Sequence, residues 1–355
     1  MSNKTIDFVK RQIEIVQGEN VIGESKLYWG VFVGVVGVIL MYPLFSSQFA
    51  VLQMTVYFTW IFLALSLAIV WGYTGIFSFG QVAFFGLGGY VYGIVAFNII
   101  DITGATNIAL LSGVVAPAIL AAIFGYFMFY GRVSGVYVAI ITLSVTLILE
   151  LIFSSATGVS IGSADLGGYN GLNLIPELTL GISGISYEFE IVSLYYFIVL
   201  SLLCLYIGLR YLVNTKFGYA MLAIREDQDR AEMLGYDIRY IKLIVFSFAG
   251  AIAGFGGAMF AAWGNYIDPT SLGLIAAALP IIWVTVGGRE TLIGPIIAAF
   301  VLQYVDNSIS SYNASAATIL IGVVLIAIIL LAPSGIVPKV ASIVKNRKIV
   351  RDNGE

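Results

Sequence analysis

Residues 214–242 read NTKFGYAMLAIREDQDRAEMLGYDIRYIK and form the longest polar interruption in the second half of an otherwise apolar chain. Helical periodicity over residues 220–234 places Met221 and Ile224, with Leu222, on one side of a predicted helix. The charged residues form a separate band: Ala223 is followed by Arg225, Glu226, Asp227, Asp229 and Arg230. Gly235 occupies the position of a C-cap glycine, since only glycine is left-handed there without strain. We expect a short amphipathic helix that couples a membrane domain to a soluble partner; a solvated loop helix without a partner is the alternative.

The remainder of the chain is too apolar for a soluble protein. Of 355 residues, 60% are hydrophobic and 10% are charged, whereas a soluble domain carries roughly 25% charged residues. The mean hydropathy is +0.98. Apolar runs of about 20 residues recur along the sequence. We therefore predict an all-α, polytopic transmembrane bundle; the strands of a β-barrel would instead alternate over about 10 residues.

The apolar runs predict about ten spans, some of them short or broken. They lie at residues 28–46, 49–71, 81–100, 107–130, 134–154, 190–212, 240–262, 272–287, 291–311 and 315–332. The predicted organisation is a cytoplasmic segment over 1–27, a transmembrane domain over 28–338 that contains the 214–242 loop, and a basic cytoplasmic tail over 339–355. The polar N-terminus lacks the apolar core of a secretory signal, so the first span is expected to stay in the protein.

The distribution of positive charge predicts the orientation. With the N-terminus inside, all 17 basic residues fall on inner segments, and every charged residue of the outer segments is acidic. Lys and Arg are in excess on cytoplasmic loops of membrane proteins. We therefore expect both termini to be cytoplasmic.

A glycine-rich stretch over residues 72–93, GYTGIFSFGQVAFFGLGGYVYG, follows one apolar span and opens another. Non-helical backbone is tolerated at membrane depth only where it is buried or lines a cavity. We interpret the stretch as a broken or re-entrant segment that lines a substrate path. Its polar side chains are Tyr73, Thr74, Ser78 and Gln81. For the later glycines, Gly86, Gly88, Gly89 and Gly93, tight helix packing is an equal alternative.

A second interruption, WVTVGGRETLIGPIIAAF over residues 283–300, occupies a similar place in the second half. Corresponding interrupted segments in two halves are a pointer to a transporter site. We therefore add Gly287, Gly288 and Thr291 to the predicted path. Gly250 and Gly254, in contrast, have the GxxxG spacing of close helix packing.

Two features of the outer half allow more than one interpretation. Glu150 lies inside a predicted span, where it either belongs to the pathway or lies close enough to the surface to be hydrated. The outer segment 155–190 caps the bundle, meets an external partner, or is an ordinary flexible loop.

The sequence lacks the residues that several kinds of chemistry require. The sequence has no histidine, and Cys204 is its only cysteine, which excludes His-based metal sites and Cys–His or Ser–His–Asp nucleophiles. It has no GxxxxGK(S/T) phosphate-binding loop. We predict no catalytic residue, no metal and no cofactor in this chain, and we expect membrane lipid but no nucleic acid as a partner. Energy for transport would enter through the 214–242 loop.

Several motifs together resemble one family. The run AIREDQDRAEMLGYDIRYIKLIVFSFAGAIAGFGGAMFA resembles the cytoplasmic loop and following span of the M-type permease subunit of branched-chain amino acid ABC importers. Four further runs resemble that family's other motifs in the same order: GYTGIFSFGQVAFFGLGGY, RVSGVYVAIITLSV, VGGRETLIGPIIAAF and LLAPSGIVPK. The resemblance extends over about residues 70–339.

The resemblance implies a permease domain that pairs with a second, related permease in a prokaryotic plasma membrane. It also implies two cytoplasmic subunits that hydrolyse ATP and an extracytoplasmic solute-binding protein. It implies that residues 223–235 dock in a groove of an ATPase, with Ala223, Ile224, Arg225, Glu226, Asp227, Arg230 and Gly235 as coupling residues.

The expected substrate is a branched-chain or other neutral amino acid. The stretch WVTVGGRETLIGP looks closer to the urea and short-chain amide branch of the same family, so those solutes are the first alternative. An ATPase-independent secondary transporter is the second, although few intramembrane acids or bases are present for it.

Overall fold

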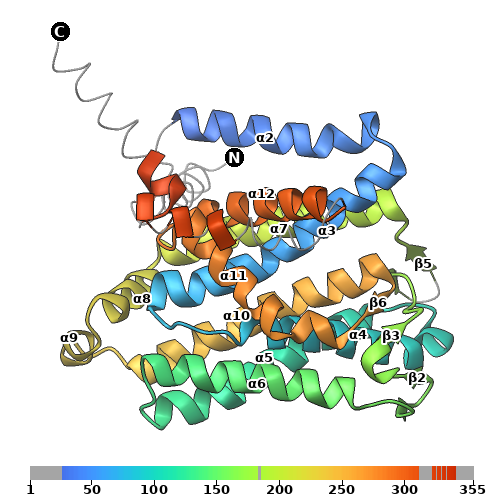
Figure 1. Cartoon of the computed structure of the whole chain (residues 1–355), viewed down its shortest axis with the longest axis horizontal. Coiled ribbons are helices and arrows are strands. Elements are labelled where there is room, and N and C mark those ends of the chain that lie inside the picture. The colour runs from blue at the N-terminus through green and yellow to red at the C-terminus, as the bar shows by residue number, and fades with distance from the viewer. Residues whose placement is uncertain are drawn as a thin grey trace, which may run out of the picture.

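The computed structural model describes residues 26–182, 185–311 and 322–340, except 325, 329 and 333. The described chain is a helical bundle, which confirms the predicted class (Figure 1). Its first half contains α2 (Lys26–Phe45), α3 (Gln48–Leu67), the π-helical turn η1 (Ala68–Gly72), α4 (Gln81–Thr103), α5 (Asn107–Tyr130) and α6 (Val136–Ser154). Its second half contains α7 (Ile191–Val213), α8 (Lys216–Glu226), α9 (Gln228–Met233), α10 (Ile238–Gly264), α11 (Leu274–Gly287) and α12 (Ile293–Ser310).

Seven helices in the described part of the chain are long and apolar enough to cross a membrane, and they correspond to the first seven predicted spans. The predicted span 272–287 is α11, a shorter apolar helix of 14 residues. The span 291–311 corresponds to α12, which has 18 residues. Most of the tenth, 315–332, lies outside the described residues. At 1.5 Å per residue, α11 is about 21 Å long, too short to cross a bilayer core of about 30 Å.

The centre of the bundle is built by close approach of α4, α5 and α10. A Cβ placed on Gly257 would lie 1.7 Å from the carbonyl oxygen of Phe85, and one on Gly88 would lie 2.2 Å from that of Gly254. Helices approach this closely only where at least one of the facing residues is a glycine, and a Cβ on Gly250 would likewise lie 2.5 Å from the Cβ of Ala121. The packing interpretation of Gly88, Gly250 and Gly254 is therefore confirmed.

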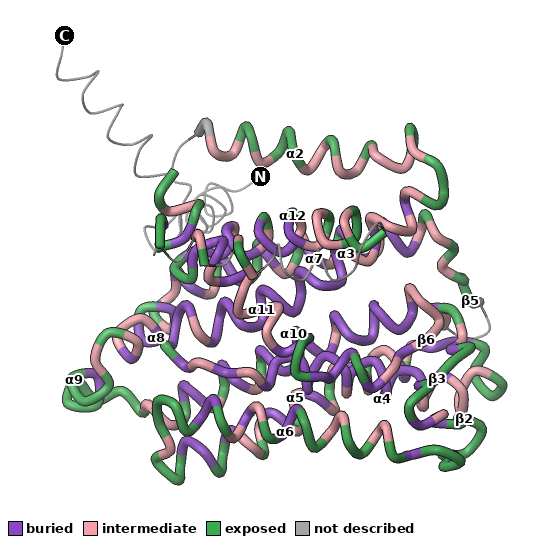
Figure 2. The backbone as a smooth tube through the Cα atoms, in the orientation of Figure 1, coloured by how far each residue is buried: buried purple, intermediate pink, exposed green. Residues whose placement is uncertain are grey.

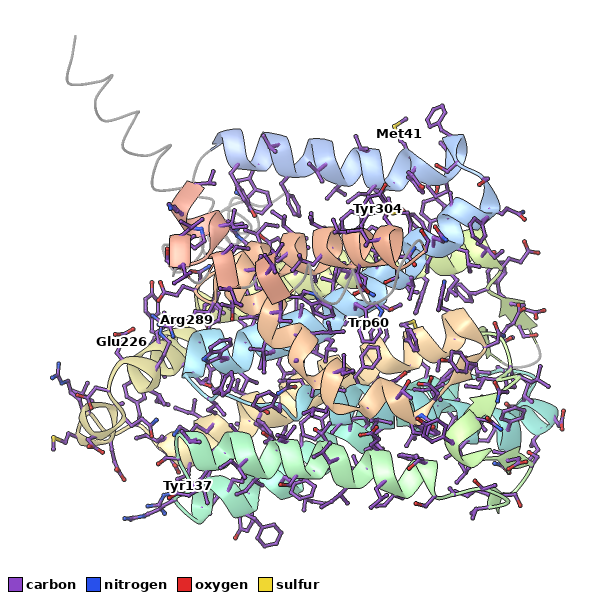
Figure 3. All side chains as sticks on the ribbon, in the orientation of Figure 1. Met41, Trp60, Tyr137, Glu226, Arg289 and Tyr304 are labelled. Carbon is purple, nitrogen blue, oxygen red and sulfur yellow. The ribbon has the colours of Figure 1, made fainter. Side chains whose placement is uncertain are left out.

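Helix α2 lies at the edge of the bundle, and none of its described side chains is buried (Figure 2). Two hydroxyls of α7 bind its main chain: Tyr195 donates to the carbonyl of Ile39 at 2.6 Å, and Tyr196 donates to that of Leu40 at 3.1 Å. Trp60, in contrast, lies in the middle of the bundle (Figure 3), stacked on Phe85.

The end of the bundle opposite α8 and α9 carries short antiparallel strands, which the sequence did not predict (Figure 1). Pairs form between β1 (Ser160–Ile161) and β2 (Ala164–Asp165), between β3 (Leu172–Asn173) and β6 (Tyr266–Ile267), and between β4 (Thr179–Ile182) and β5 (Ile185–Glu188). The 3-10 turns η2 (Gly168–Asn170) and η3 (Pro269–Leu272) lie among them.

Hydrogen bonds fix these strands to the adjacent ends of the helices. In the register of β3 with β6, Leu172 pairs with Ile267, which ties the outer segment to the end of α10. Asn107, at the start of α5, donates to the carbonyl of Gly181 at 2.6 Å. The described residues of the 155–190 segment therefore form a hydrogen-bonded cap, and the interpretation as an ordinary flexible loop is wrong. Glu150 is half-buried beneath the cap, next to Gly273.

Candidate functional site

The loop that follows α7 contains two short helices where the sequence predicts one. The expected helix over 220–234 begins earlier, at Lys216, and is interrupted at Asp227, whose backbone is extended (φ −159°, ψ 109°). The Asp227 carboxylate accepts the backbone N–H of Arg230 at 3.0 Å, so it caps the start of α9. The prediction of one continuous helix is wrong because an aspartate that can cap a new helix competes with continuing the old one.

The predicted C-cap is confirmed. Gly235 has φ +88°, and its N–H donates to the carbonyl of Glu232 at 2.9 Å. The N–H of Tyr236 donates to the carbonyl of Ala231 at 3.2 Å. This pair of bonds is the Schellman arrangement, which ends a helix with a left-handed residue. Gly235 therefore turns the chain from α9 into α10.

The two faces of α8 and α9 are as different as the sequence predicts. Met221 and Ile224 are buried against the bundle, and Ala223 is half-buried. Glu226 and Arg230 are exposed. Two apolar side chains that the sequence analysis did not single out stand at the end of α9: Met233 is 86% exposed and Leu234 is 71% exposed. Their position immediately before the capping glycine is the sequence signal that could have identified them.

Arg225 connects this loop to the rest of the bundle. Its Nη1 donates to the carbonyl oxygen of Gly72 at 2.8 Å, and its Nη2 pairs with Glu226 at 2.8 Å. The same Nη2 lies 4.0 Å from a carboxylate oxygen of Glu290. Only 23% of the Arg225 side chain is accessible. One guanidinium therefore contacts both interruptions that the sequence predicts.

The first break, residues 72–80, begins at the last residue of the π-helical turn η1, keeps a helical backbone through residue 74 and runs as non-helical chain from residue 75 to the start of α4. Two hydroxyls of α6 satisfy its backbone: Thr142 accepts the N–H of Phe79 at 3.1 Å, and Thr146 donates to the carbonyl of Phe79 at 3.3 Å. Non-helical backbone inside a bundle needs such partners because no water replaces them. These roles of Thr142 and Thr146 were not predicted from the sequence.

The polar side chains predicted for a path are buried at this break: Tyr73 is 1% exposed, and Thr74, Ser78 and Gln81 are each 0% exposed. Most of their bonds are local. Thr74 donates to the carbonyl of Val70, Ser78 accepts the N–H of Gly80 at 3.1 Å, and Gln81 accepts the hydroxyl of Ser66 at 3.1 Å. The Tyr73 hydroxyl and the Gln81 amide nitrogen have no hydrogen-bond partner in the described part of the chain.

The second break, residues 287–292, is a tight turn between α11 and α12. Thr291 donates its hydroxyl to the carbonyl of Gly288 at 3.0 Å and accepts the N–H of Gly294 at 3.1 Å. Thr291 is 2% exposed. A Cβ on Gly287 would lie 2.2 Å from the backbone of Gly294, so α11 and α12 touch directly.

The two breaks also touch each other. A Cβ placed on Gly72 would lie 2.0 Å from the carbonyl oxygen of Arg289. We call the meeting point of Gly72, Arg225, Arg289 and Glu290 the three-way junction. Figure 3 places Glu226 and Arg289 together at the end of the bundle that holds α8. The structure thus brings the predicted coupling residue Arg225 to both breaks, whereas Ser78 and Gln81 lie deeper, beside Ser66 and α6.

Comparisons with known proteins identify the family of the chain. Residues 49–330 match the family model described as the branched-chain amino acid transport system permease component. The chain is 25% identical over 319 residues to the high-affinity branched-chain amino acid transport system permease protein LivM of Escherichia coli (strain K12), with 84% of this chain and 72% of that protein covered.

Sugar permeases are also similar. The L-arabinose ABC transporter permease protein AraH of Azospirillum brasilense is 27% identical, with 62% of each chain covered. The ribose import permease protein RbsC of Escherichia coli (strain K12) is 23% identical, with 63% of this chain and 67% of that protein covered. No solved structure matches the chain.

The matched region contains α3 to α12, and with them both breaks, α8 and α9. A permease component of an ABC importer is not itself an enzyme; partner ATPase subunits hydrolyse the ATP. Because the family model matches most of the chain, this polytopic membrane protein belongs to the branched-chain amino acid transport permease family.

Proposed function

We propose that this chain is one half of the membrane domain of a binding-protein-dependent importer of branched-chain or other neutral amino acids. It pairs with a second permease, receives solute from an extracytoplasmic binding protein and docks a cytoplasmic ATPase. The observation that carries the proposal is the contact of Arg225 with both breaks, because it joins a partner-facing loop to the interrupted segments of the bundle.

The docking surface in this proposal is the exposed side of α9. Met233 and Leu234 offer apolar side chains to a groove on the ATPase, and Glu226 and Arg230 add exposed charges on the same pair of short helices. A small apolar centre with a polar rim is the usual arrangement of a protein interface. The mostly buried opposite face holds the loop against its own bundle, so a displacement of α9 reaches Arg225.

The relay inside the bundle then has two steps in this proposal. Movement of α8 displaces the Arg225 guanidinium, and the guanidinium then pulls the Gly72 carbonyl and Glu290 with it. The first break is extended and the second is a turn, so both can change shape without breaking a helix. The Tyr73 hydroxyl and the Gln81 amide nitrogen, which have no partner among the described residues, are the donors that a polar solute would meet when the path opens.

The orientation proposed is both termini in the cytoplasm of a bacterial cell, with the chain in the inner membrane. It is supported by charge. Arg132 and Arg289 belong to turns at the end that holds α8 and α9, and Arg230 and Arg239 lie in α9 and at the start of α10 at the same end, whereas Asp165, Glu188 and Asp268 lie with the strands at the other end (Figure 1). Positive charge marks the cytoplasmic side. The strand-bearing cap is then the surface that meets the binding protein.

The docking role is tested with the permease co-expressed with its ATPase. Replacement of both Met233 and Leu234 by Asp places two charges at the centre of the proposed interface, and it should abolish ATPase co-purification and ATP-dependent uptake in proteoliposomes. Tyr219→Ser, an exposed site on α8, is the matched control and should leave both unchanged. Full association and uptake in the double variant would overturn the docking role.

Substrate choice needs a separate measurement, because the relatives include sugar permeases. Calorimetry of the cognate binding protein against leucine, urea, ribose and arabinose would identify the solute class. Heat of binding with leucine alone supports the proposal. Binding of urea instead supports the amide alternative, and binding of a pentose places the chain with the sugar permeases.

A further inference from the structure

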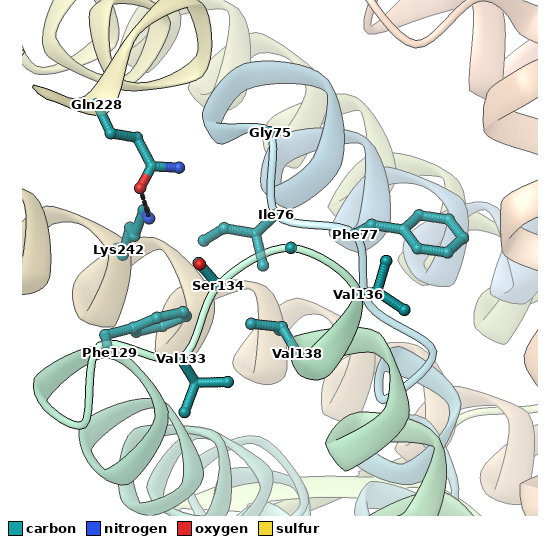
Figure 4. A pocket seen from close by; sticks show the side chains of 11 residues that line it. Gly75, Ile76, Phe77, Phe129, Val133, Ser134, Val136, Val138, Gln228 and Lys242 are labelled. Atoms are coloured by element: carbon teal, nitrogen blue, oxygen red, sulfur yellow. Dashed lines mark hydrogen bonds between the residues drawn. The ribbon is translucent and has the colours of Figure 1, made fainter. Parts of the chain in front are cut away.

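A cavity of about 260 Å³ lies beside the first break, at the end of the bundle that holds α9 (Figure 4). Four segments enclose it: the non-helical chain at Gly75, Ile76 and Phe77, the turn between α5 and α6 with the adjoining helix ends, the start of α9, and α10 at Lys242. It adjoins a larger hollow of about 450 Å³ that shares Phe129, Val133, Ser134, Gln228 and Lys242 as lining residues. The cavity therefore touches the elements that the proposed transport cycle would move.

Lys242 is the one charged residue among the eleven that line the smaller cavity. It is 7% exposed. Its Nζ donates to the amide oxygen of Gln228 at 2.7 Å and lies 5.9 Å from the centre of the Phe129 ring. In the described part of the chain no carboxylate lies within ion-pair distance of this nitrogen. A buried ammonium with only neutral contacts has two N–H donors left to offer to an anion.

The opposite wall offers further donors. Helix α6 begins at Val136 after Gly135, and no side chain caps its first turn. The unpaired N–H groups of a helix start attract anions, phosphates in particular. Ser134 adds a hydroxyl from the same turn, and Figure 4 shows it lining the cavity together with Lys242. Arg132, at the edge of the larger hollow, holds a left-handed backbone (φ +58°) that an arginine rarely adopts.

The charges of the larger hollow balance. Arg132, Arg239 and Lys242 carry three positive charges, and Asp229, Glu232 and Asp237 carry three negative charges. The Asp237 carboxylate already accepts the N–H of Tyr240 at 3.1 Å. Without Lys242, which lines both spaces, the larger hollow holds one more negative than positive charge, and the smaller cavity beside it holds the single positive charge of Lys242. An anion is drawn to the inner space and not to its mouth.

We propose that this cavity binds a phosphate group, held by the Lys242 ammonium, the Ser134 hydroxyl and the first N–H groups of α6. A phosphate has enough acceptor oxygens for all three. Its source is either the headgroup of an anionic phospholipid or a soluble phosphate. The exposed rings of Tyr126, Tyr130 and Tyr137 around the same turn are typical of the lipid–water boundary, and they favour the lipid. A bound phosphate would join α10 to the start of α6, beside the first break.

The test measures binding by the full-length purified chain and needs no transport assay. Detergent-solubilised protein is titrated with inorganic phosphate, with dihexanoyl phosphatidylglycerol and with dihexanoyl phosphatidylcholine, and the shift of the thermal midpoint is followed. Saturable stabilisation by either of the first two probes is expected. Phosphatidylglycerol active without inorganic phosphate identifies a lipid site, and the reverse identifies a soluble ligand.

Variants locate the site. Lys242→Gln should weaken the binding of the active probe about tenfold, the loss of one charge-assisted hydrogen bond. Lys242→Arg should restore most of it, and Ser134→Ala should weaken it less. Lys216→Gln, an exposed lysine on α8, is the matched control and should bind as the unmodified chain does. Should Lys242→Gln fail to fold, Ser134→Ala decides the matter. Three results would overturn the proposal: stabilisation by all three probes alike, stabilisation by none of them, or stabilisation of both Ser134→Ala and Lys242→Gln equal to that of the unmodified chain.

Discussion

The two interruptions of the bundle occupy similar places in the two halves of the chain but are held in different ways. The first break is extended, and its backbone depends on Thr142 and Thr146 of a separate helix. The second is a compact turn, and it depends on its own Thr291. A segment held by a distant helix responds when that helix moves, whereas a self-contained turn moves as one piece. The difference suggests that the first break changes shape during transport and that the second carries α11 and α12 as a unit.

The largest expected effect comes from forcing the two breaks apart. Gly72→Ala would place a methyl group 2.0 Å from the carbonyl oxygen of Arg289, and neither backbone can yield. We expect a loss of about 3 kcal/mol in the free energy of unfolding, at the upper end of overpacking costs. Thermal unfolding of the purified chain measures it.

The matched control is Gly208→Ala on α7, where nothing lies within 4 Å of the added Cβ. It should be neutral or slightly stabilising, because alanine favours the helix. An unfolding midpoint for Gly72→Ala equal to that of the control would show that the two breaks are not in contact.

A smaller effect is expected from the support of the first break. Replacing both Thr142 and Thr146 by Val keeps their shape and leaves the N–H and the carbonyl of Phe79 without partners. This should cost about 2 kcal/mol, because a buried unsatisfied group costs roughly 1–3 kcal/mol. Hydrogen exchange should rise at residues 75–80 and stay unchanged at 287–292.

Ser144→Ala is the control for this pair, since Ser144 is exposed on the same helix and bonds only within it, to Ile140. Faster exchange at both breaks would show that the second also depends on α6, and the comparison between them would then fail.

The smallest expected effect is on transport alone. Arg225→Ala removes the donor to Gly72 and the link to Glu290. We expect ATP-dependent uptake to fall about tenfold, consistent with losing one hydrogen bond to a charged group, while ATPase association is retained. Lys216→Ala, also basic and on α8, should transport normally. Uptake undiminished in Arg225→Ala would exclude the junction from coupling.

Much of this arrangement follows from local chemistry that the sequence displays. Gly235 caps a helix because its positive φ strains residues that carry a Cβ, and the apolar pattern of Met221 and Ile224 predicts the buried face. The interruption at Asp227 was missed because an aspartate inside a polar run suits a helix surface and a helix start equally. Periodicity alone does not choose between the two.

The contacts that make the site were beyond prediction for a different reason. Gly72 and Arg289 are far apart in the sequence, and their contact is between main-chain atoms, which carry no side-chain signature. Thr142 and Thr146 read as ordinary residues of an apolar span, since their partner is the backbone of Phe79. The paired strands of the outer cap have only two to four residues each, too few to show an alternating pattern.

The partner of Arg225 is a peptide oxygen, and this limits how the protein can evolve. Every amino acid at position 72 supplies that oxygen, so no codon change there deletes the acceptor. A mutation can therefore affect this bond in only two ways. It can replace the donor at position 225, or it can add a side chain at position 72, where only the hydrogen atom of glycine fits. A suppressor screen that begins with an inactive Arg225 variant should return new cations on neighbouring turns, never a new acceptor.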